Sequence, residues 1–268
     1  MTSNSIIMNR TKKTLLSVFM LFLTTGASAF PFISPYAYCH NNPVLLVDPD
    51  GMDDYFSNNG RFMYSTSKGS KVYVGNNLIT TVPLTSKTSR QAVANVMGYY
   101  AKEVGISYYA KGGQPVGDSP KGTVGLADFG KSSDATPAHT KGDDIHVNRN
   151  GNKICSTLYD KYNIMSTLEH EEYHKEAGHG KNGSLSASAH ADIYAKQIGS
   201  STFLNTTEEY QTGIIESFIK YLNYAIEDGT NDTRINSLIN DVNNSLQKLG
   251  HQIFYERDGS GSFNIYSR

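Results

Sequence analysis

The sequence predicts an α+β protein in which β-hairpins come first and a mainly helical part follows. Between residues 53 and 83, short aromatic and β-branched runs alternate with turns rich in Asn and Gly, a pattern typical of β-hairpins. From about residue 152 onward, apolar residues recur every three or four positions, as in helices packed on a core. With 268 residues, 38% of them hydrophobic and 18% charged, the chain is long enough to bury a full core.

Hairpins are expected over 55–64 and 71–82, each around a turn that contains Asn and Gly. The spacing of apolar residues predicts a helix over 89–105. These elements form the first predicted region, residues 53–110. Residues 111–143 are rich in Gly, Ser, Lys, Pro and Asp, and we expect a long loop or an interdomain joint there.

The second predicted region, residues 144–268, is mainly helical. It opens with a short strand over 144–148, and helical spacing then leads into residues 166–179. This helix is opened by Asn152 or Ser156, or is broken in two near Asn163. Further elements are expected in this order: helices over 184–199, from 207, and over 232–249, and a terminal hairpin of 252–255 with 262–266.

Charge and cysteine content exclude several classes of protein. The formal net charge is -1, so the chain lacks the broad basic surface that binds nucleic acid, and no nucleic-acid partner is expected. A nuclease is therefore the least favoured enzyme. The two cysteines, Cys39 and Cys155, allow at most one disulfide and exclude a four-cysteine zinc site. A metal site must accordingly use histidines and carboxylates.

The first 29 residues are typical of a secretory signal peptide. Basic residues at positions 10–13 precede an apolar run over 15–23, and Ala27-Ser28-Ala29 follows as a small-residue cleavage signal. The apolar run is shorter than the roughly 20 residues that a membrane span needs. A buried helix is the alternative, which the terminal position and basic flank disfavour. We therefore expect a secreted protein that keeps no membrane span once residues 1–29 are removed.

Residues 170–174 read His-Glu-Glu-Tyr-His, an HExxH pattern. On a helix His170 and His174 lie on the same face, so both imidazoles can bind one Zn²⁺ ion, and Glu171 stands close enough to act as a base on a water molecule. A catalytic zinc needs a third protein ligand. The metzincin pattern places Gly and His three and six residues after the second His. Here Gly178 and His179 lie four and five residues after it, so that pattern fails.

The third ligand is sought on the helix that follows, as in gluzincin-like enzymes. Residues 190–197, HADIYAKQ, resemble the ligand helix of Rhs-linked metallopeptidase toxins, which often reads ExxAYxxQ. Tyr194 and Gln197 coincide with that pattern, and His190 takes the place of the ligating Glu. The resemblance thus implies a three-histidine zinc site of His170, His174 and His190. Asp192 is expected to support a ligand ring, or to ligate in an alternative register.

Two further stretches carry the resemblance. Residues 162–171, YNIMSTLEHE, are similar to the YNxxxTLxHE that leads into the motif in these toxins. Residues 34–52, SPYAYCHNNPVLLVDPDGM, resemble the end of the Rhs-repeat-associated core domain, SPYAYxxNNPxxxxDPDG. In that family a variable toxin begins just after this segment and is released by self-cleavage. The upstream repeats and the acidic motif linked to cleavage are absent here, so residues 30–52 are interpreted as a core remnant.

Together these patterns predict a zincin-like, gluzincin-type metallopeptidase toxin domain over 144–268. The resemblance implies a protein or peptide substrate and a cognate immunity protein. Glu171 is expected to activate the water that attacks the peptide carbonyl. Four side chains are candidates for stabilising the oxyanion: Tyr194, His139, His146 and Tyr162. The alternative is a non-catalytic secreted Rhs-derived fragment with a binding or decayed role.

Overall fold

The structure is a computed structural model, and it describes residues 52–106, 108–110, 115–116, 122–128, 136–179, 185–257 and 263–267. All of these residues belong to one compact unit, Val47–Arg268. The predicted signal peptide lies outside the described residues. So do Cys39 and, except for Met52, the predicted Rhs remnant.

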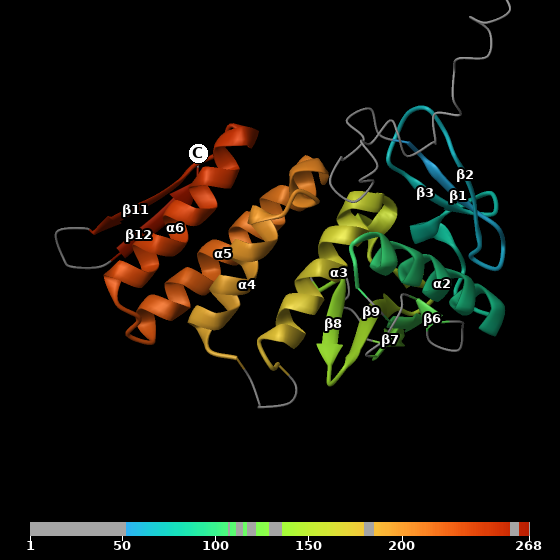
Figure 1. The fold of residues 1–268 in the computed structure, drawn as a ribbon, viewed down its shortest axis with the longest axis horizontal. Coiled ribbons are helices and arrows are strands. Elements are labelled where there is room, and N and C mark those ends of the chain that lie inside the picture. The colour runs from blue at the N-terminus through green and yellow to red at the C-terminus, as the bar shows by residue number, and fades with distance from the viewer. Residues whose placement is uncertain are drawn as a thin grey trace, which may run out of the picture. The chain divides into compact units, whose positions relative to one another are not determined.

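A small N-terminal sheet has the strand order β2-β1-β3-β4 (Figure 1). Its strands are β1 (Asp54–Phe56), β2 (Phe62–Ser65), β3 (Val72–Val74) and β4 (Asn77–Leu78). The pairs β1/β2 and β3/β4 are antiparallel, which confirms the first predicted hairpin. The second is shorter than predicted, because Ile79–Thr81 forms a 3-10 helix instead of continuing the strand. The turn between β1 and β2 depends on Gly60, whose φ is +78° and whose missing Cβ would lie 2.1 Å from the backbone oxygen of Ala92.

Helix α2 (Lys87–Glu103) follows the short 3-10 helix Ile79–Thr81 and corresponds to the helix predicted over 89–105. It begins at Lys87 rather than at residue 89, because Ser86 is the N-cap residue and Ser89 completes a capping box with it. Its C-terminus is followed by Gly105, whose φ of +76° ends the helix where the sequence predicts.

A second sheet contains the strand predicted over 144–148, which is confirmed, and extends into the stretch where a loop was predicted. Its order is β10-β9-β7-β5-β6, and β8 also pairs with β9. Its strands are β5 (Tyr108–Ala110), β6 (Pro115–Val116), β7 (Gly122–Asp128), β8 (Ala138–Lys141), β9 (Asp144–Asn150) and β10 (Lys153–Ile154). The prediction of a loop over 111–143 was thus wrong for β6, β7 and β8. Parallel pairing of β7 with β5 and β9 stabilises a Gly-containing strand whose local sequence favours a loop.

The helical part agrees with the prediction from residue 161 onward (Figure 1). Its helices are α3 (Lys161–Glu176), α4 (Ala187–Gly199), α5 (Glu208–Glu227) and α6 (Asp232–Leu246), with 3-10 helices at Ser156–Tyr159, Phe203–Asn205 and Gln247–Leu249. Strands β11 (Ile253–Arg257) and β12 (Phe263–Ser267) form the predicted terminal hairpin. Neither Asn152 nor Ser156 opens α3. Asp160 does, because its carboxylate accepts hydrogen bonds from the backbone N–H groups of Tyr162 and Asn163.

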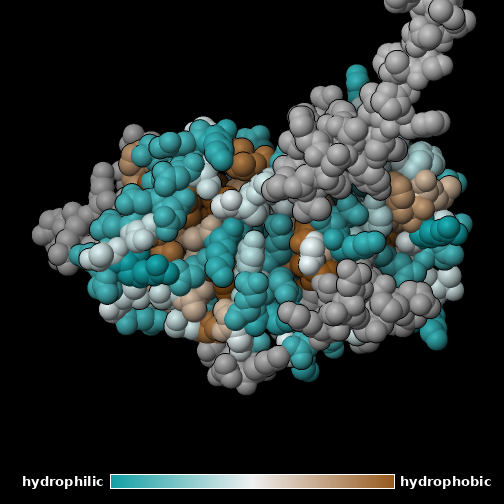
Figure 2. All heavy atoms as spheres, in the orientation of Figure 1, coloured by the Kyte–Doolittle hydropathy of each residue, from teal (hydrophilic) through white to brown (hydrophobic). Residues whose placement is uncertain are grey.

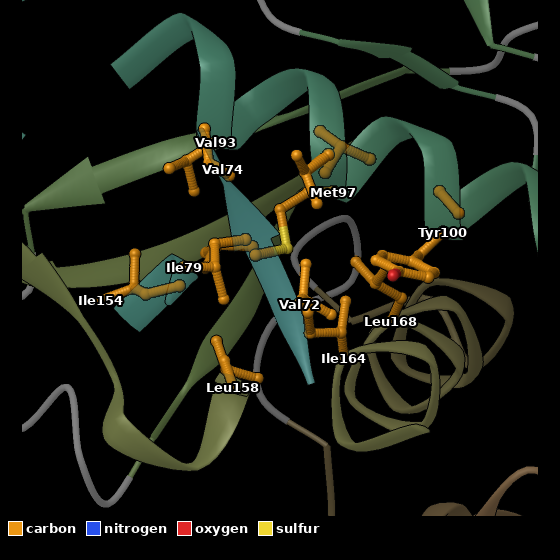
Figure 3. Close-up of a cluster of buried hydrophobic side chains, with 14 of the residues drawn as sticks. Val72, Val74, Ile79, Val93, Met97, Tyr100, Ile154, Leu158, Ile164 and Leu168 are labelled. Carbon is orange, nitrogen blue, oxygen red and sulfur yellow. The ribbon is translucent and has the colours of Figure 1, made fainter. Parts of the chain in front are cut away.

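Two hydrophobic cores organise the described residues. The first joins the N-terminal sheet, α2, the second sheet and one side of α3, and Figure 3 shows Val72, Met97 and Leu168 among its side chains. The second core joins α4, α5, α6 and Ile253. Because the first core contains residues from Phe56 to Leu168, the predicted regions 53–110 and 144–268 share it. The fold is therefore mixed, with a small N-terminal sheet and a mainly helical C-terminal part, as expected for the α+β class.

Helix α3 packs against α2, β8 and α4, so it lies between the sheets and the other helices. Ile164 and Leu168 enter the first core, whereas its opposite side carries buried polar residues. Asn163 there accepts a hydrogen bond from the N–H of Thr207, the N-cap of α5. On the face shown in Figure 2, hydrophilic side chains cover much of the outer surface of the helices. Among the described residues, no helix has the length and apolar character of a membrane span.

Candidate functional site

A cleft of about 400 Å³ lies where α3 faces β8 on one side and α4 and α5 on the other. It is lined mainly by polar and aromatic side chains from these four elements. The lining residues are Thr136, Pro137, Ala138, His139, Thr140, Thr157, Thr167, His170, Glu171, His174, His179, His190, Tyr194, Gln197, Glu209, Tyr210, Gly213, Ile214, Ser217 and Tyr221. The three predicted metal ligands and the predicted base are all among them.

His170 and His174 lie one turn apart on α3, and their Nε2 atoms are 3.0 Å from each other. Burial lowers the pKa of His170 to about 4. Burial, together with the neighbouring imidazoles, lowers the pKa of His174 to about 2. Both rings are therefore neutral at pH 7, which is the protonation state that can donate a lone pair to a metal.

Gln197 of α4 fixes the orientation of His170. Its Nε2 donates to the carbonyl oxygen and the hydroxyl of Ser166 and to the hydroxyl of Tyr210, so its Oε1 is left as the acceptor. This Oε1 lies 2.8 Å from Nδ1 of His170. The network assigns the proton of His170 to Nδ1 and the lone pair to Nε2, the atom that faces His174.

The carboxylate of Glu171 is buried in the cleft and is held by the edge strand β8. Thr140 donates its hydroxyl to Oε2 of Glu171 at 2.9 Å, and this hydroxyl also lies 2.8 Å from the backbone oxygen of Glu171. Burial raises the pKa of Glu171 to about 7, while the hydrogen bond from Thr140 opposes the shift. A buried carboxyl with one oxygen tied to a hydroxyl is well placed to exchange a proton with a water molecule.

Two more histidines complete a cluster of four imidazoles. The His190 ring on α4 lies 5.1 Å from that of His174 and stacks on Tyr221 of α5 at 4.6 Å. Nδ1 of His190 is 3.2 Å from the backbone oxygen of Ser186. The fourth ring, that of His179, lies 5.0 Å from His174 and 5.8 Å from His190.

His179 reaches the cluster through the turn that ends α3. Gly178 has a φ of +80°, the N–H of Gly178 donates to Lys175, and the N–H of His179 donates to His174. This pair of bonds is a Schellman motif. It folds the chain back after the end of α3, so that His179 lies beside His174. The sequence patterns placed His179 outside the site, although a Gly one residue before it, just past a helix end, is the signal for this turn.

The other predicted residues separate into two groups. Tyr194 and His139 line the cleft, and the Tyr194 ring lies 4.6 Å from that of His170. His146 and Tyr162 do not line it. Asp192 does not line it either: its carboxylate forms an ion pair with Arg234 of α6, so the predicted role of Asp192 as support or ligand has no counterpart in this geometry.

Among the residues that the structure describes, no three or more His, Cys, Asp or Glu side chains are already arranged as a metal site. The donor atoms nevertheless fit a metal in two respects. The 3.0 Å between Nε2 of His170 and Nε2 of His174 is close to the separation of about 3.3 Å between two nitrogens on a tetrahedral zinc. In addition, Nδ1 of His179, whose ring lies beside that of His174, is buried without a hydrogen-bond partner among the described residues. The donors fit in kind, and a third ligand can come from His190 or His179.

Comparison with known proteins agrees with this chemistry. The chain matches the family model described as metallopeptidase toxin 2 over residues 54–257, a segment that includes every residue lining the cleft. No curated protein and no solved structure matches the chain. The matched segment spans well over half of the sequence. The chain therefore belongs to the metallopeptidase toxin 2 family.

Proposed function

We propose that the chain is a secreted toxin and a zinc-dependent peptidase whose active site is the cleft around α3. Membership of a metallopeptidase toxin family supports a peptidase that acts on protein. One observation carries the proposal: the Nε2 atoms of His170 and His174 lie 3.0 Å apart in the cleft that the buried side chain of Glu171 also lines. Export and a cognate immunity protein remain predictions from the sequence.

In this proposal His170, His174 and His190 hold the zinc ion. His190 is favoured over His179 because its Nδ1 faces the Ser186 carbonyl oxygen, an acceptor that fixes the tautomer and leaves Nε2 to ligate. Nδ1 of His179 has no such partner among the described residues. When bound, zinc would lower the pKa of a water molecule and polarise the scissile carbonyl group.

Glu171 is the proposed general base. It takes the proton of the attacking water and later passes it to the leaving amine, while Thr140 keeps the carboxylate in place. Tyr194 and His139 are the proposed donors to the oxyanion, from opposite walls of the cleft. Burial raises the pKa of Tyr194 to about 12, so its hydroxyl keeps the proton that it would donate.

The wall made by β8 supports an extended peptide as the substrate. Residues 136–140 line the cleft, and β8 pairs with β9 along one edge. In the part of the chain that the structure describes, no strand pairs with the other edge of β8. A peptide can add to such an edge through backbone hydrogen bonds, which would place its carbonyl groups beside α3.

The test is to measure zinc content and peptidase activity of the full chain and its variants. We expect about one zinc per wild-type chain and its loss in His170→Ala. Glu171→Gln should retain zinc but lose activity by about 10²- to 10⁴-fold, the usual contribution of a general base. Glu172→Gln is the matched control, because Glu172 pairs with Lys175 and does not line the cleft. It should keep both properties.

The outcomes separate the proposal from the non-catalytic alternative. Wild-type protein without zinc, or zinc retained in His170→Ala, would remove the metal site. Cells that produce the chain should be poisoned by wild-type protein and by Glu172→Gln, and should tolerate Glu171→Gln. Equal toxicity of Glu171→Gln would favour a non-catalytic binding role.

A further inference from the structure

We infer that the α5 wall of the cleft is a subsite for a basic substrate side chain. The missing side chain of Gly213 provides the space for it, and Glu209 provides the negative charge. The inference rests on the proposed peptidase function: the cleft would accept a substrate with arginine or lysine near the scissile peptide bond.

One face of α5 forms this wall. The lining residues Tyr210, Gly213, Ile214, Ser217 and Tyr221 follow one another at intervals of one, three or four, so they lie along a single stripe of the helix. Glu209 also lines the cleft and stands four residues before Gly213, one turn away.

Gly213 has no reason to be glycine in the packing of the protein itself. It lies inside the 20-residue helix α5, where glycine is among the least favourable residues. A Cβ built on Gly213 would meet no atom within 4 Å, so no neighbour excludes a larger residue. Because Gly213 lines the cleft, the missing side chain enlarges the cleft instead. We attribute the glycine to the space that a substrate side chain needs.

The charge on the α5 wall favours a cation. Among the described residues that line the cleft, Glu171 and Glu209 are acidic and none is Lys or Arg. Glu171 is assigned to the chemistry and is tied to Thr140. The carboxylate of Glu209 forms no ion pair with any described residue. It is therefore available to a charge that arrives with the substrate.

A favourable interaction with the dipole of α5 does not by itself explain Glu209. An acidic residue in the first turn stabilises a helix through its dipole, and both Glu208 and Glu209 stand in the first turn of α5. Only Glu209 lines the cleft. An arginine or lysine would lay its aliphatic stem across Gly213 and Ile214 and bring its cation to Glu209, the arrangement that long basic side chains adopt on partly apolar surfaces.

The test measures equilibrium binding of synthetic peptides to the full chain carrying Glu171→Gln, which removes cleavage from the readout. Each peptide carries one arginine, moved through successive positions, and is compared with the same peptide carrying norleucine. We expect the arginine peptide to bind about five- to tenfold more tightly at one position, and less so at high salt. Adding Glu209→Gln should abolish this preference, whereas Glu208→Gln, the matched control, should keep it.

A second pair of variants tests the space. Gly213→Leu should weaken binding of the arginine peptide at least tenfold, whereas Thr212→Leu, on the neighbouring exposed position outside the cleft, should leave it unchanged. Equal binding of the two peptides, or a preference that survives Glu209→Gln, would overturn the inference. Binding is measured without cleavage, so the two hypotheses can fail separately. If the variants show the arginine preference but the wild-type chain cleaves no peptide, the proposed peptidase function is contradicted and the basic subsite is not.

Discussion

The two hydrophobic cores contact α3 in different ways. The first core receives apolar side chains from α3, with Ile164 and Leu168 fully buried among the strands and α2. The second core contains no residue of α3. Between that core and α3 lies a buried polar layer in which Asn163, Ser166 and Thr167 bond to α4 and α5.

The difference shows how a rigid helix can also carry polar chemistry. Apolar packing on one side fixes the position of α3, so its other side is free to hold histidines and a carboxylate. The helices of the second core then supply partners to that side: Gln197 orients His170, and Tyr210 bonds to Thr167. The cleft occurs at the boundary between the two cores, where polar groups bond to one another instead of packing as closely as apolar side chains.

The largest expected effect comes from breaking each core in turn. Leu168→Ala in the first core and Leu222→Ala in the second both remove a fully buried side chain, and each should lower the free energy of unfolding by about 2–5 kcal/mol. The polar layer joins the cores, so we expect one cooperative transition in chemical denaturation for both variants. Two separate transitions in Leu222→Ala would show that the cores fold independently.

A smaller effect is expected from Gln197→Ala within the polar layer. Loss of its hydrogen bonds leaves Nδ1 of His170 and the hydroxyl of Ser166 with fewer partners, which should cost about 1–3 kcal/mol of stability. If His170 binds zinc, loss of this orienting bond should also weaken zinc affinity about 10- to 100-fold in a competition assay with a chelator.

Gln211→Ala provides the control for that experiment. Gln211 is a buried glutamine on α5 that donates to the backbone oxygens of Phe203 and Thr206 and does not line the cleft. Its loss should cost a similar amount of stability and leave zinc affinity unchanged. Unchanged zinc affinity in Gln197→Ala would show that His170 needs no orientation by α4.

The smallest effect is expected from Asp192→Ala, outside both cores. The ion pair of Asp192 with Arg234 is partly exposed, so its loss should change the free energy of unfolding by less than about 1 kcal/mol. Zinc content should stay the same. A fall in zinc content would restore Asp192 to the ligand role that the sequence suggested for it.

The sequence predicts the helical part well because helices are local structures. Apolar spacing identified α4, α5 and α6, and the HExxH spacing alone brings His170 and His174 together. Strand β7 was missed because its stability comes from parallel partners at 108–110 and 144–150, which a reading of residues 122–128 does not reveal. The same limit hid the parallel pairing of β1 with β3.

The site shows the same division between local and distant signals. Gln197 stood out in the sequence as part of a motif, but its bond to His170 spans 27 residues and could be seen only in the structure. Thr140, Glu209 and Gly213 carry no motif, and the fold alone brings them to the cleft. His179 is an intermediate case. The known spacings of metal ligands exclude it from the site, whereas the helix-ending turn that Gly178 predicts would bring it there.

The Schellman turn at the end of α3 has a consequence for how tolerant this region is to insertion and deletion. Each residue added to or removed from a helix rotates the next part of the chain by about 100° around the helix axis. The backbone of the turn, and not a side-chain contact, sets where His179 emerges. A change of one residue between His174 and Gly178 would therefore swing this imidazole out of the cleft, although every amino acid of the HExxH motif would be preserved.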